Sequence, residues 1–200
     1  MPLSLLSYGV YNRNMDKKLK RLKRTLAYEG EVVDLYKDKM QYPNGSIHDW
    51  DFVCHKKGYG ACILPVLPDG RILLIRQYRP AVDDTILEIP AGAIEPSDEN
   101  TLMCAKRELA EETGYTSNMV SHLLRIQVAV AYCNEWLDIY LARNCIKTKQ
   151  CQKLDEGEDI STEIFDKEQL LKMISDGQIQ DAKTVAAITA FAANLGAGNI

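Results

Sequence analysis

Several features that would assign this sequence to a specialised class are missing from it. No apolar stretch approaches the roughly 18 residues that span a bilayer. The amino terminus, MPLSLLSYGVYNRNMDKKLKRLK, does not resemble a secretory signal, because its apolar run is short and its basic residues come afterwards. The formal net charge of −4 gives no reason to expect a nucleic-acid partner. We therefore expect a cytoplasmic protein that binds neither membranes nor nucleic acids.

Residue patterns typical of zinc sites are missing as well. The six cysteines include no C-x-x-C pair, and the three histidines are scattered. Cysteines without metal-ligand spacing are typical of free thiols in a reducing compartment. The sequence also has no internal repeat and no low-complexity tract. Its 200 residues are enough for one domain with a sizeable core and one appended element.

The most informative feature that is present is an acidic run after Arg107. Glu108, Glu111 and Glu112 lie in the segment RELAEE. On a helix, residues four apart share a face, so Glu108 and Glu112 would lie one turn apart with Glu111 beside them. Neighbouring carboxylates repel one another unless a cation lies between them, and hard oxygen ligands suit Mg²⁺ or Mn²⁺. The run alone is also typical of a solvated helix surface, so its interpretation as a phosphate-cleaving metal site depends on the residues around it.

The flanking residues predict a helix at this place. Pro90 and Gly92 predict a loop after an apolar strand. Ser97 or Asp98 can cap the start of the helix, and Gly114 stands where a glycine ends one. Each signal is weak by itself, but all agree with the helical spacing of the glutamates.

Hydrophobic patterning predicts an α/β protein in two parts, an amino-terminal element at 1–57 and a domain at 58–200. In the first part, the basic run 17–24 is expected to be helical or irregular, ahead of two extended segments. The second part is expected to begin with a hairpin of apolar strands. Strands on both sides of one long helix, with helices at the end, predict an α/β sandwich. The expected extended segments are 31–36 and 47–55, the hairpin 60–67 with 71–78, the later strands 86–89, 121–130 and 135–142, and the last helices 167–175 and 184–194.

The segment from Gly92 to Tyr115 resembles the box of the Nudix hydrolases, G-x5-E-x7-R-E-U-x-E-E-x-G-U, where U is a bulky apolar residue. Glu99 and the run that starts at Arg107 fit the box in register. One departure is that six residues, not five, separate Gly92 from Glu99. A one-residue insertion in a loop leaves the helix register intact. The resemblance implies a Nudix-type α/β/α sandwich with a mixed sheet that hydrolyses a pyrophosphate with bound Mg²⁺ or Mn²⁺.

The resemblance also implies roles for individual residues of the box. The metal would be held by Glu108, Glu111 and Glu112, with the backbone carbonyl of Ala91 as an additional ligand. Arg107 would not face the substrate and would instead orient one of the glutamates by an ion pair.

A catalytic base is still needed, because the helix glutamates are occupied by metal. In the ADP-ribose pyrophosphatase branch of the family, the catalytic glutamate lies in a loop that corresponds to the acidic run 155–159 here. Glu156 is the first candidate and Glu158 the second. The alternative for either residue is a solvated acidic turn.

Three further segments resemble the same branch and imply substrate contacts. RQYRP and LEIPAG place substrate-binding positions at Arg79 and Glu88. WDFV resembles a strand whose aromatic residue, here Trp50, stacks on adenine, although a tryptophan is also typical of core packing. The P-G-x-x-x-E turn of the branch keeps its acidic residue as Glu135, but Val130 stands in place of the proline. This departure leaves the sugar and the nucleotide open.

The activity implied is hydrolysis of a nucleoside diphosphate-sugar, with ADP-ribose to AMP and ribose 5-phosphate as the leading reaction. The alternatives are another nucleotide sugar or dinucleotide, such as a GDP- or UDP-hexose, FAD or NADH, and a non-catalytic nucleotide sensor on the same fold. Relatives of this branch are homodimers that pair their amino-terminal strands. The few extended segments in 1–57 cannot bury both of their faces alone, so we expect a homodimer.

Overall fold

The computed structural model describes residues 19–149, 152–154 and 159–195. The chain divides into two compact units between Val53 and Cys54. The functional division into an amino-terminal element at 1–57 and a hydrolase domain at 58–200 stays a prediction.

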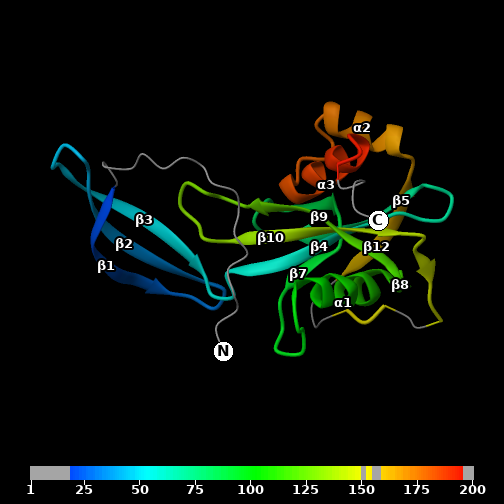
Figure 1. The fold of residues 1–200 in the computed structure, drawn as a ribbon, viewed down its shortest axis with the longest axis horizontal. Coiled ribbons are helices and arrows are strands. Elements are labelled where there is room, and N and C mark those ends of the chain that lie inside the picture. The colour runs from blue at the N-terminus through cyan, green and yellow to red at the C-terminus, as the bar shows by residue number, and fades with distance from the viewer. Residues whose placement is uncertain (1–18, 150–151, 155–158, 196–200) are drawn as a thin grey trace. The chain divides into compact units, whose positions relative to one another are not determined.

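The amino-terminal unit is a three-stranded sheet in the order β1-β2-β3, made of β1 (Lys20–Glu29), β2 (Val33–Gln41) and β3 (Ile47–His55) (Figure 1). The expectation that the basic run is helical or irregular is wrong from Lys20 onward, because β1 pairs antiparallel with β2 along its length. Nearly every residue of β1 is exposed. A strand exposed on both faces has no alternation of apolar and polar residues, so its periodicity could not reveal it.

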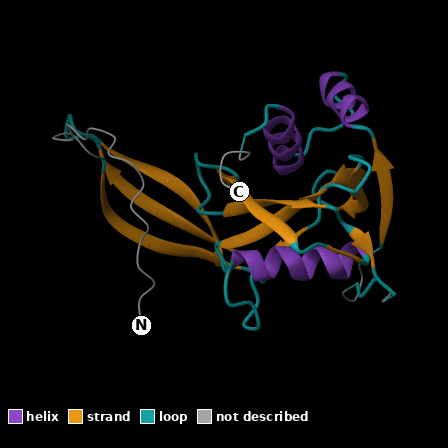
Figure 2. Ribbon diagram, turned by 45° about the vertical axis from the view of Figure 1, so that its right-hand side comes forward, coloured by secondary structure: helices purple, strands orange, loops and turns teal. Residues whose placement is uncertain are grey.

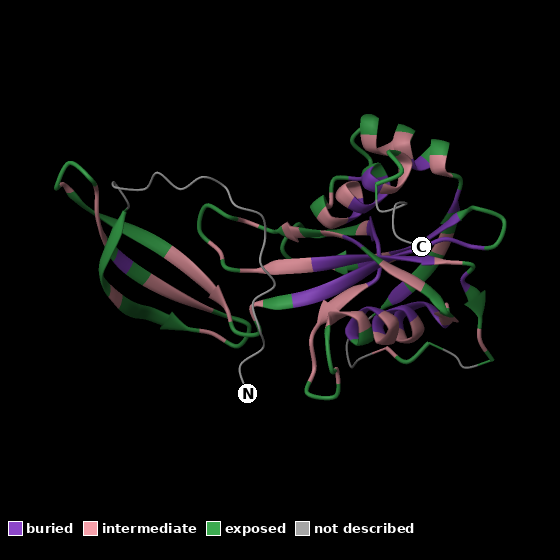
Figure 3. Ribbon diagram, viewed as in Figure 1, coloured by how far each residue is buried: buried purple, intermediate pink, exposed green. Residues whose placement is uncertain are grey.

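This sheet has almost no core of its own. Asp38 is the one buried residue among those described up to Val53, and Figure 3 shows the rest as exposed or intermediate. The Asp38 carboxylate accepts hydrogen bonds from Arg21 Nε at 2.8 Å and from Arg24 Nε at 2.7 Å. Arg24 also lies over the ring of Phe52, 4.1 Å from its centroid. Charge pairs and a cation–π contact therefore stabilise the sheet where an apolar core would be expected.

The second unit contains two main sheets, and one of them is mixed. The order of this sheet is β7-β4-β10-β9, with β7 (Ala91–Ala93), β4 (Tyr59–Pro65), β10 (Trp136–Arg143) and β9 (Met119–Gln127). β10 runs parallel to β4 and antiparallel to β9, and β7 runs antiparallel to β4. The expectation of a mixed sheet is confirmed.

The other main sheet has the order β12-β5-β6, with β12 (Ile160–Phe165), β5 (Ile72–Arg79) and β6 (Asp84–Glu88), all antiparallel. The expected hairpin of 60–67 with 71–78 is therefore wrong. β4 and β5 belong to different sheets and share only the isolated bridge between Val66 and Ile72 at the turn. Two adjacent apolar runs with a tight turn are typical of a hairpin. In the tertiary structure, however, β4 pairs with β7 and β10, and β5 pairs with β12 and β6. A short pair, β8 (Tyr115–Thr116) with β11 (Ile146–Lys147), completes the strands.

Helices cover both faces of the mixed sheet, as Figures 1 and 2 show. α1 (Thr101–Thr113) lies on one side, and α2 (Lys167–Ser175) and α3 (Ala182–Ala192) lie on the other. Alternate residues of β4 enter two cores, because successive side chains point to opposite faces. Ala61 and Ile63 pack with α1, whereas Cys62 and Leu64 join the core that includes α2 and α3. No helix in the described part of the chain is long and apolar enough to cross a membrane.

The ends of α1 show how the sequence sets the position of the acidic helix. Asn100 caps its start and accepts a hydrogen bond from the backbone N–H of Met103 at 3.1 Å, so the expected cap at Ser97 or Asp98 is wrong. Asp98 has other partners, as described with the site. The expected end is confirmed: Gly114 has a φ of 72°, and its N–H donates to the Ala110 carbonyl at 2.9 Å.

Candidate active site

Strand β7 lies directly against the acidic helix at Gly92. A Cβ at Gly92 would lie 1.8 Å from Oε1 and 2.2 Å from Cδ of Glu108. Gly92 is not among the glycines with a positive φ, so space and not backbone conformation requires glycine here. The missing side chain at Gly92 therefore makes room for the Glu108 carboxylate.

The neighbouring residue Ala91 is attached to a second glutamate of the helix. Its N–H donates to Glu112 Oε2 at 3.0 Å. Ala91 opposes Cys62 in the ladder, and the adjacent Pro90 carbonyl accepts from Ile63 N at 3.0 Å. Ala91 and Cys62 are therefore a non-hydrogen-bonded pair of the antiparallel ladder. In such a pair, the N–H and C=O groups of each residue point away from the partner strand. The Ala91 carbonyl therefore lies on the side of β7 away from β4, the side that its predicted role as a metal ligand requires.

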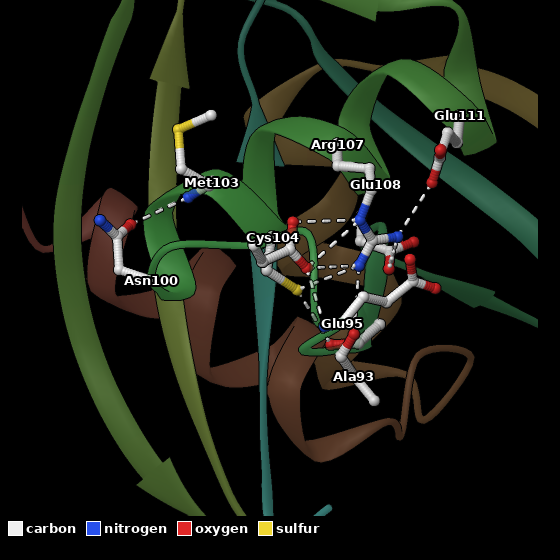
Figure 4. Close-up of polar contacts among 10 residues, drawn as sticks. Ala93, Glu95, Asn100, Met103, Cys104, Arg107, Glu108 and Glu111 are labelled. Atoms are coloured by element: carbon white, nitrogen blue, oxygen red, sulfur yellow. Dashed lines mark hydrogen bonds and ion pairs between the residues drawn. The ribbon is translucent and has the colours of Figure 1, made fainter.

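Arg107 joins the helix, the loop after β7 and β7 itself (Figure 4). Its Nη1 donates to Glu108 Oε1 at 2.7 Å and to Glu111 Oε2 at 2.9 Å. Its Nη2 donates to Asp98 Oδ2 at 2.9 Å and to the Ala93 carbonyl at 3.1 Å. A planar guanidinium can serve several acceptors at once. Arg107 therefore has the ion pairs that its predicted orienting role needs.

These contacts keep both Arg107 and Asp98 charged. The hydrogen bonds from Arg107 hold the pKa of Asp98 below its ordinary value, and they outweigh the effect of burial. Burial alone would lower the pKa of Arg107, but hydrogen bonds to Asp98 and Glu111 and the charge of Glu108 raise it. The pair therefore stays ionised at neutral pH.

The three glutamates line a cavity of about 220 Å³ together with Ala91–Ala93. Glu108 and Glu112 are buried, whereas Glu111 is partly exposed. In the part of the chain that the structure describes, no three acidic, histidine or cysteine side chains are grouped closely enough to hold a metal. Arg107 bonds to two of the carboxylates, so a cation would have to compete with it for Glu108 and Glu111. Carboxylates beside a backbone carbonyl nonetheless fit Mg²⁺ or Mn²⁺, which also keep water or substrate oxygens as ligands.

A second cavity of about 280 Å³ shares the wall Ala91–Ala93 with the first. It is lined by two of the predicted substrate-binding residues, Arg79 and Glu135. Arg79 donates from Nε and Nη2 to the two oxygens of Glu88, at 2.6 and 2.9 Å. Bidentate pairing fixes the plane of the guanidinium, and within the described residues no hydrogen bond is made by Nη1. Glu88 has 1% of its side chain exposed, so it lies beneath Arg79 as its partner.

Lys183 and Asp181 belong to this second cavity, although the sequence did not single them out as site residues. Lys183 Nζ donates to Glu88 and lies 3.0 Å from Asp181 Oδ2. Asp181 also caps α3 and accepts hydrogen bonds from Thr184 N at 3.0 Å and from Thr184 Oγ1 at 2.6 Å. An aspartate three residues before a threonine was the available signal for a helix start. Nothing in the sequence showed that the following lysine would reach Glu88 on β6.

The loop after β9 forms the rim of the second cavity. Val128 and Glu135 both line it, and the Val128 N–H donates to the Glu135 carbonyl at 3.1 Å. The backbone is also turned at Ala129, whose carbonyl accepts from Tyr132 N at 3.1 Å and Cys133 N at 2.9 Å. The loop thus closes on itself by hydrogen bonds at the place where the resemblance implied a turn with proline and glycine. Val130, at the proline position, is 72% exposed.

Three predicted site residues remain, Trp50, Glu156 and Glu158. Trp50 lies on β3 in the amino-terminal unit, 40% exposed, and its indole N–H donates to the Tyr42 hydroxyl at 3.1 Å. Glu156 and Glu158 lie outside the described residues.

Comparison with known proteins adds three findings. A family model described as NUDIX domain matches residues 56–188. An ADP-ribose pyrophosphatase of Bacillus subtilis (strain 168) is 31% identical over 169 residues, which cover 84% of this chain and 90% of the relative. A methanol dehydrogenase activator of Bacillus methanolicus is 30% identical over 169 residues, with the same coverage of 84% and 90%.

Solved structures show the same fold. One described as ADP compounds hydrolase superposes with a TM-score of 0.79 and covers 92% of this chain and 97% of its own. Its sequence identity is 21%, so it shows shared architecture alone.

Proposed function

The chain belongs to the Nudix family and is a pyrophosphohydrolase, and from that premise we propose that it hydrolyses a nucleoside diphosphate-sugar, with ADP-ribose as the first candidate. One observation carries the proposal. The cavity lined by the three helix glutamates and the cavity lined by Arg79 share one wall, Ala91–Ala93. A substrate with a diphosphate in the middle needs two adjoining compartments of this kind, one for its nucleoside and one for its phosphates.

The residues of the first cavity would hold and orient a cation. Glu108, Glu111 and Glu112 and the Ala91 carbonyl supply the ligands, and the cation when bound would neutralise phosphate charge and acidify water. Arg107 acts as a positioning residue, because its guanidinium bonds to Glu108, Glu111 and Asp98. Gly92 keeps the space into which the Glu108 carboxylate fits.

The reaction is a displacement at phosphorus. The oxygen of a water forms a new bond to one phosphorus, and the bond between that phosphorus and the bridging oxygen breaks. The bridging oxygen leaves with the other phosphate, so that ADP-ribose yields AMP and ribose 5-phosphate. The water proton goes to a carboxylate, for which Glu156 is the first candidate and Glu158 the second.

Substrate choice is proposed from the second cavity. Arg79, fixed by Glu88, offers its outer N–H groups to a phosphate or ribose oxygen. Glu135 offers an acceptor for sugar hydroxyls at the rim of the cavity. The relatives named ADP-ribose pyrophosphatase support ADP-ribose. The relative named methanol dehydrogenase activator has nearly the same identity and a name that gives no substrate, so the alternatives of another nucleotide sugar, FAD or NADH stay open.

The test is hydrolysis of a substrate panel with Mg²⁺ or Mn²⁺. ADP-ribose, GDP-mannose, UDP-glucose, NADH and FAD are each incubated with the protein, and the phosphomonoesters are separated and measured. Labelled water identifies the phosphorus that is attacked. Glu112→Gln should abolish cleavage, whereas Glu168→Gln, on the exposed side of α2, should leave it unchanged. Absence of cleavage of every compound by the wild-type protein would remove the proposal and favour a nucleotide sensor.

We also propose a homodimer built on the amino-terminal sheet. A three-stranded sheet whose single buried residue, among those described, is Asp38 leaves its apolar side chains exposed. Leu26, Tyr28 and Trp50 are all at least 40% exposed, and a second copy would cover them. Stacking of Trp50 on the base of a bound nucleotide belongs to the same proposal.

Light scattering at micromolar concentration tests the dimer. We expect twice the chain mass of 22.5 kDa. Trp50→Ala should raise KM without altering the fold, as judged by circular dichroism. A monomeric wild-type protein that is fully active would contradict the dimer.

A further inference from the structure

Two lysines line the carboxylate cavity in addition to the residues of the box. Lys57 and Lys153 both border the same space of about 220 Å³ as Glu108, Glu111 and Glu112. They come from segments nearly 100 residues apart, the turn before β4 and the segment after β11, so only the fold brings them to one cavity.

Hydrogen bonds hold the backbone of Lys153 and of the residues on either side of Lys57. The Lys153 N–H donates to the Glu111 carbonyl near the end of α1, at 2.9 Å. Next to Lys57, Gly58 has a φ of 73° and its N–H donates to His55 Nδ1 at 3.1 Å. The His55 N–H in turn donates to Asn134 Oδ1 at 2.9 Å. Both lysines are therefore attached at defined points on the rim of the cavity.

Neither ammonium group is used to hold the fold. Within the described residues, Lys57 and Lys153 have no ion pair and no side-chain hydrogen bond, whereas Arg107 gives its donors to Asp98, Glu108 and Glu111. Both lysines are exposed at the rim. Ammonium groups without an ion pair repel a divalent cation that binds to the nearby carboxylates alone. They attract an anion, and so favour binding of the cation together with a phosphate.

We propose that Lys57 and Lys153 bind the diphosphate oxygens of the substrate at the rim of this cavity, an inference that rests on the proposed function. The oxygens that face α1 would be neutralised by the cation, and those that face the rim by the two ammonium groups. Lysine is suited to this place because its compact charge follows a phosphate without a fixed orientation. The same groups would retain the phosphomonoester product after cleavage.

If the lysines have this role, their removal should change the affinity for a diphosphate and the affinity for Mn²⁺ in different directions. Removal of an ammonium group should weaken the binding of a diphosphate, because an attraction is lost. It should leave the binding of Mn²⁺ alone unchanged or strengthen it, because a repulsion is lost. A merely structural role would weaken both ligands and lower the thermal midpoint at the same time.

The experiment uses the full chain with Lys57→Met, Lys153→Met and the double variant. Lys56→Met and Lys147→Met serve as controls, since both are exposed lysines that do not line the cavity. The binding of α,β-methylene-ADP in the presence of Mn²⁺, and of Mn²⁺ alone, is measured by calorimetry at low ionic strength. We expect a loss of diphosphate affinity of about threefold for each single variant and about tenfold for the double variant, as for exposed charge pairs.

Several outcomes separate the inference from the proposed function. If the double variant binds the diphosphate within a factor of about 1.5 of wild type, below the range of exposed charge pairs, the inference is overturned. It is also overturned if Mn²⁺ affinity and thermal midpoint fall together with diphosphate affinity. If the wild-type protein cleaves no nucleotide sugar but diphosphate binding still depends on the lysines, the inference holds and the proposed function fails.

Discussion

Replacement of Gly92 by alanine is the sharpest perturbation that the structure offers. The new Cβ would lie 1.8 Å from Glu108 Oε1, far inside any van der Waals contact. Backbone strain does not contribute, because Gly92 is not at a positive φ. β7 is paired with β4 through Ala61 and cannot move away without breaking the ladder. Glu108 must therefore leave its position.

The size of the effect follows from what Glu108 loses. Its carboxylate accepts a hydrogen bond of 2.7 Å from Arg107 in a buried place, and such a charge-assisted bond contributes about 1.5–3 kcal/mol. A chain of this size should then lose about 3–12 °C in Tm. Loss of one orienting contact at a metal site typically lowers metal affinity about 10–100-fold. We expect kcat/KM to fall by about the same factor.

Three measurements check this prediction. They are Mn²⁺ binding by calorimetry, kcat/KM on the best substrate of the panel, and Tm without metal. Gly70→Ala is the control, because its Cβ would meet nothing within 4 Å, whereas its φ of 88° strains the backbone of an alanine. It should lose stability and keep metal affinity. If Gly92→Ala binds Mn²⁺ as wild type does, Glu108 is not held where the structure has it and the reasoning fails.

Three further predictions concern charges around the site. Arg107→Lys should lower kcat/KM about 10–100-fold, because one ammonium group cannot bond to both helix glutamates and Asp98; a value within threefold of wild type would contradict this. Arg107 lowers the pKa of Asp98, so this aspartate stabilises the fold above about pH 4 and the contribution is lost as pH falls through its folded pKa. In urea unfolding between pH 3 and 6, Asp98→Asn should therefore flatten the acid side of the stability profile. Glu88→Gln should destabilise the protein by about 3–5 kcal/mol, because Arg79 and Lys183 would lose the buried anion between them.

An exposed ion pair provides the control for the Glu88 variant. Glu163 and Arg76 pair at 2.5 Å with 39% of each side chain exposed. Glu163→Gln should therefore change the free energy of unfolding by less than about 1 kcal/mol. Equal losses for Glu88→Gln and Glu163→Gln would mean that burial does not decide the contribution of these pairs.

The acidic helix shows how much could be predicted from local sequence. Spacing placed Glu108 and Glu112 on one face, and Gly114 marked the end of the helix. The start was missed, because Asp98 is as good a cap as Asn100 by residue type, but its carboxylate accepts from Arg107 and from the Glu95 N–H instead. Helix signals are local, whereas competition for a side chain is not.

Strand partners could not be predicted in the same way. The hairpin expected at the Pro68-Asp69-Gly70 turn has the turn but not the pairing. β4 lies instead between β7 and β10, and β5 lies between β12 and β6. Strand pairing depends on which apolar faces are buried together, and residues far away in sequence contribute to that choice.

The sequence by itself therefore determined the family and the acidic helix with its three carboxylates, because these depend on residue type and on spacing within one element. The tertiary structure alone decided that β7 passes close enough to α1 to require glycine at Gly92, and that Lys183 reaches Glu88 behind Arg79. It also decided that Lys57 and Lys153 meet at the same cavity. Such placements arise when segments far apart in the chain pack together, and no pattern within any one of those segments records them.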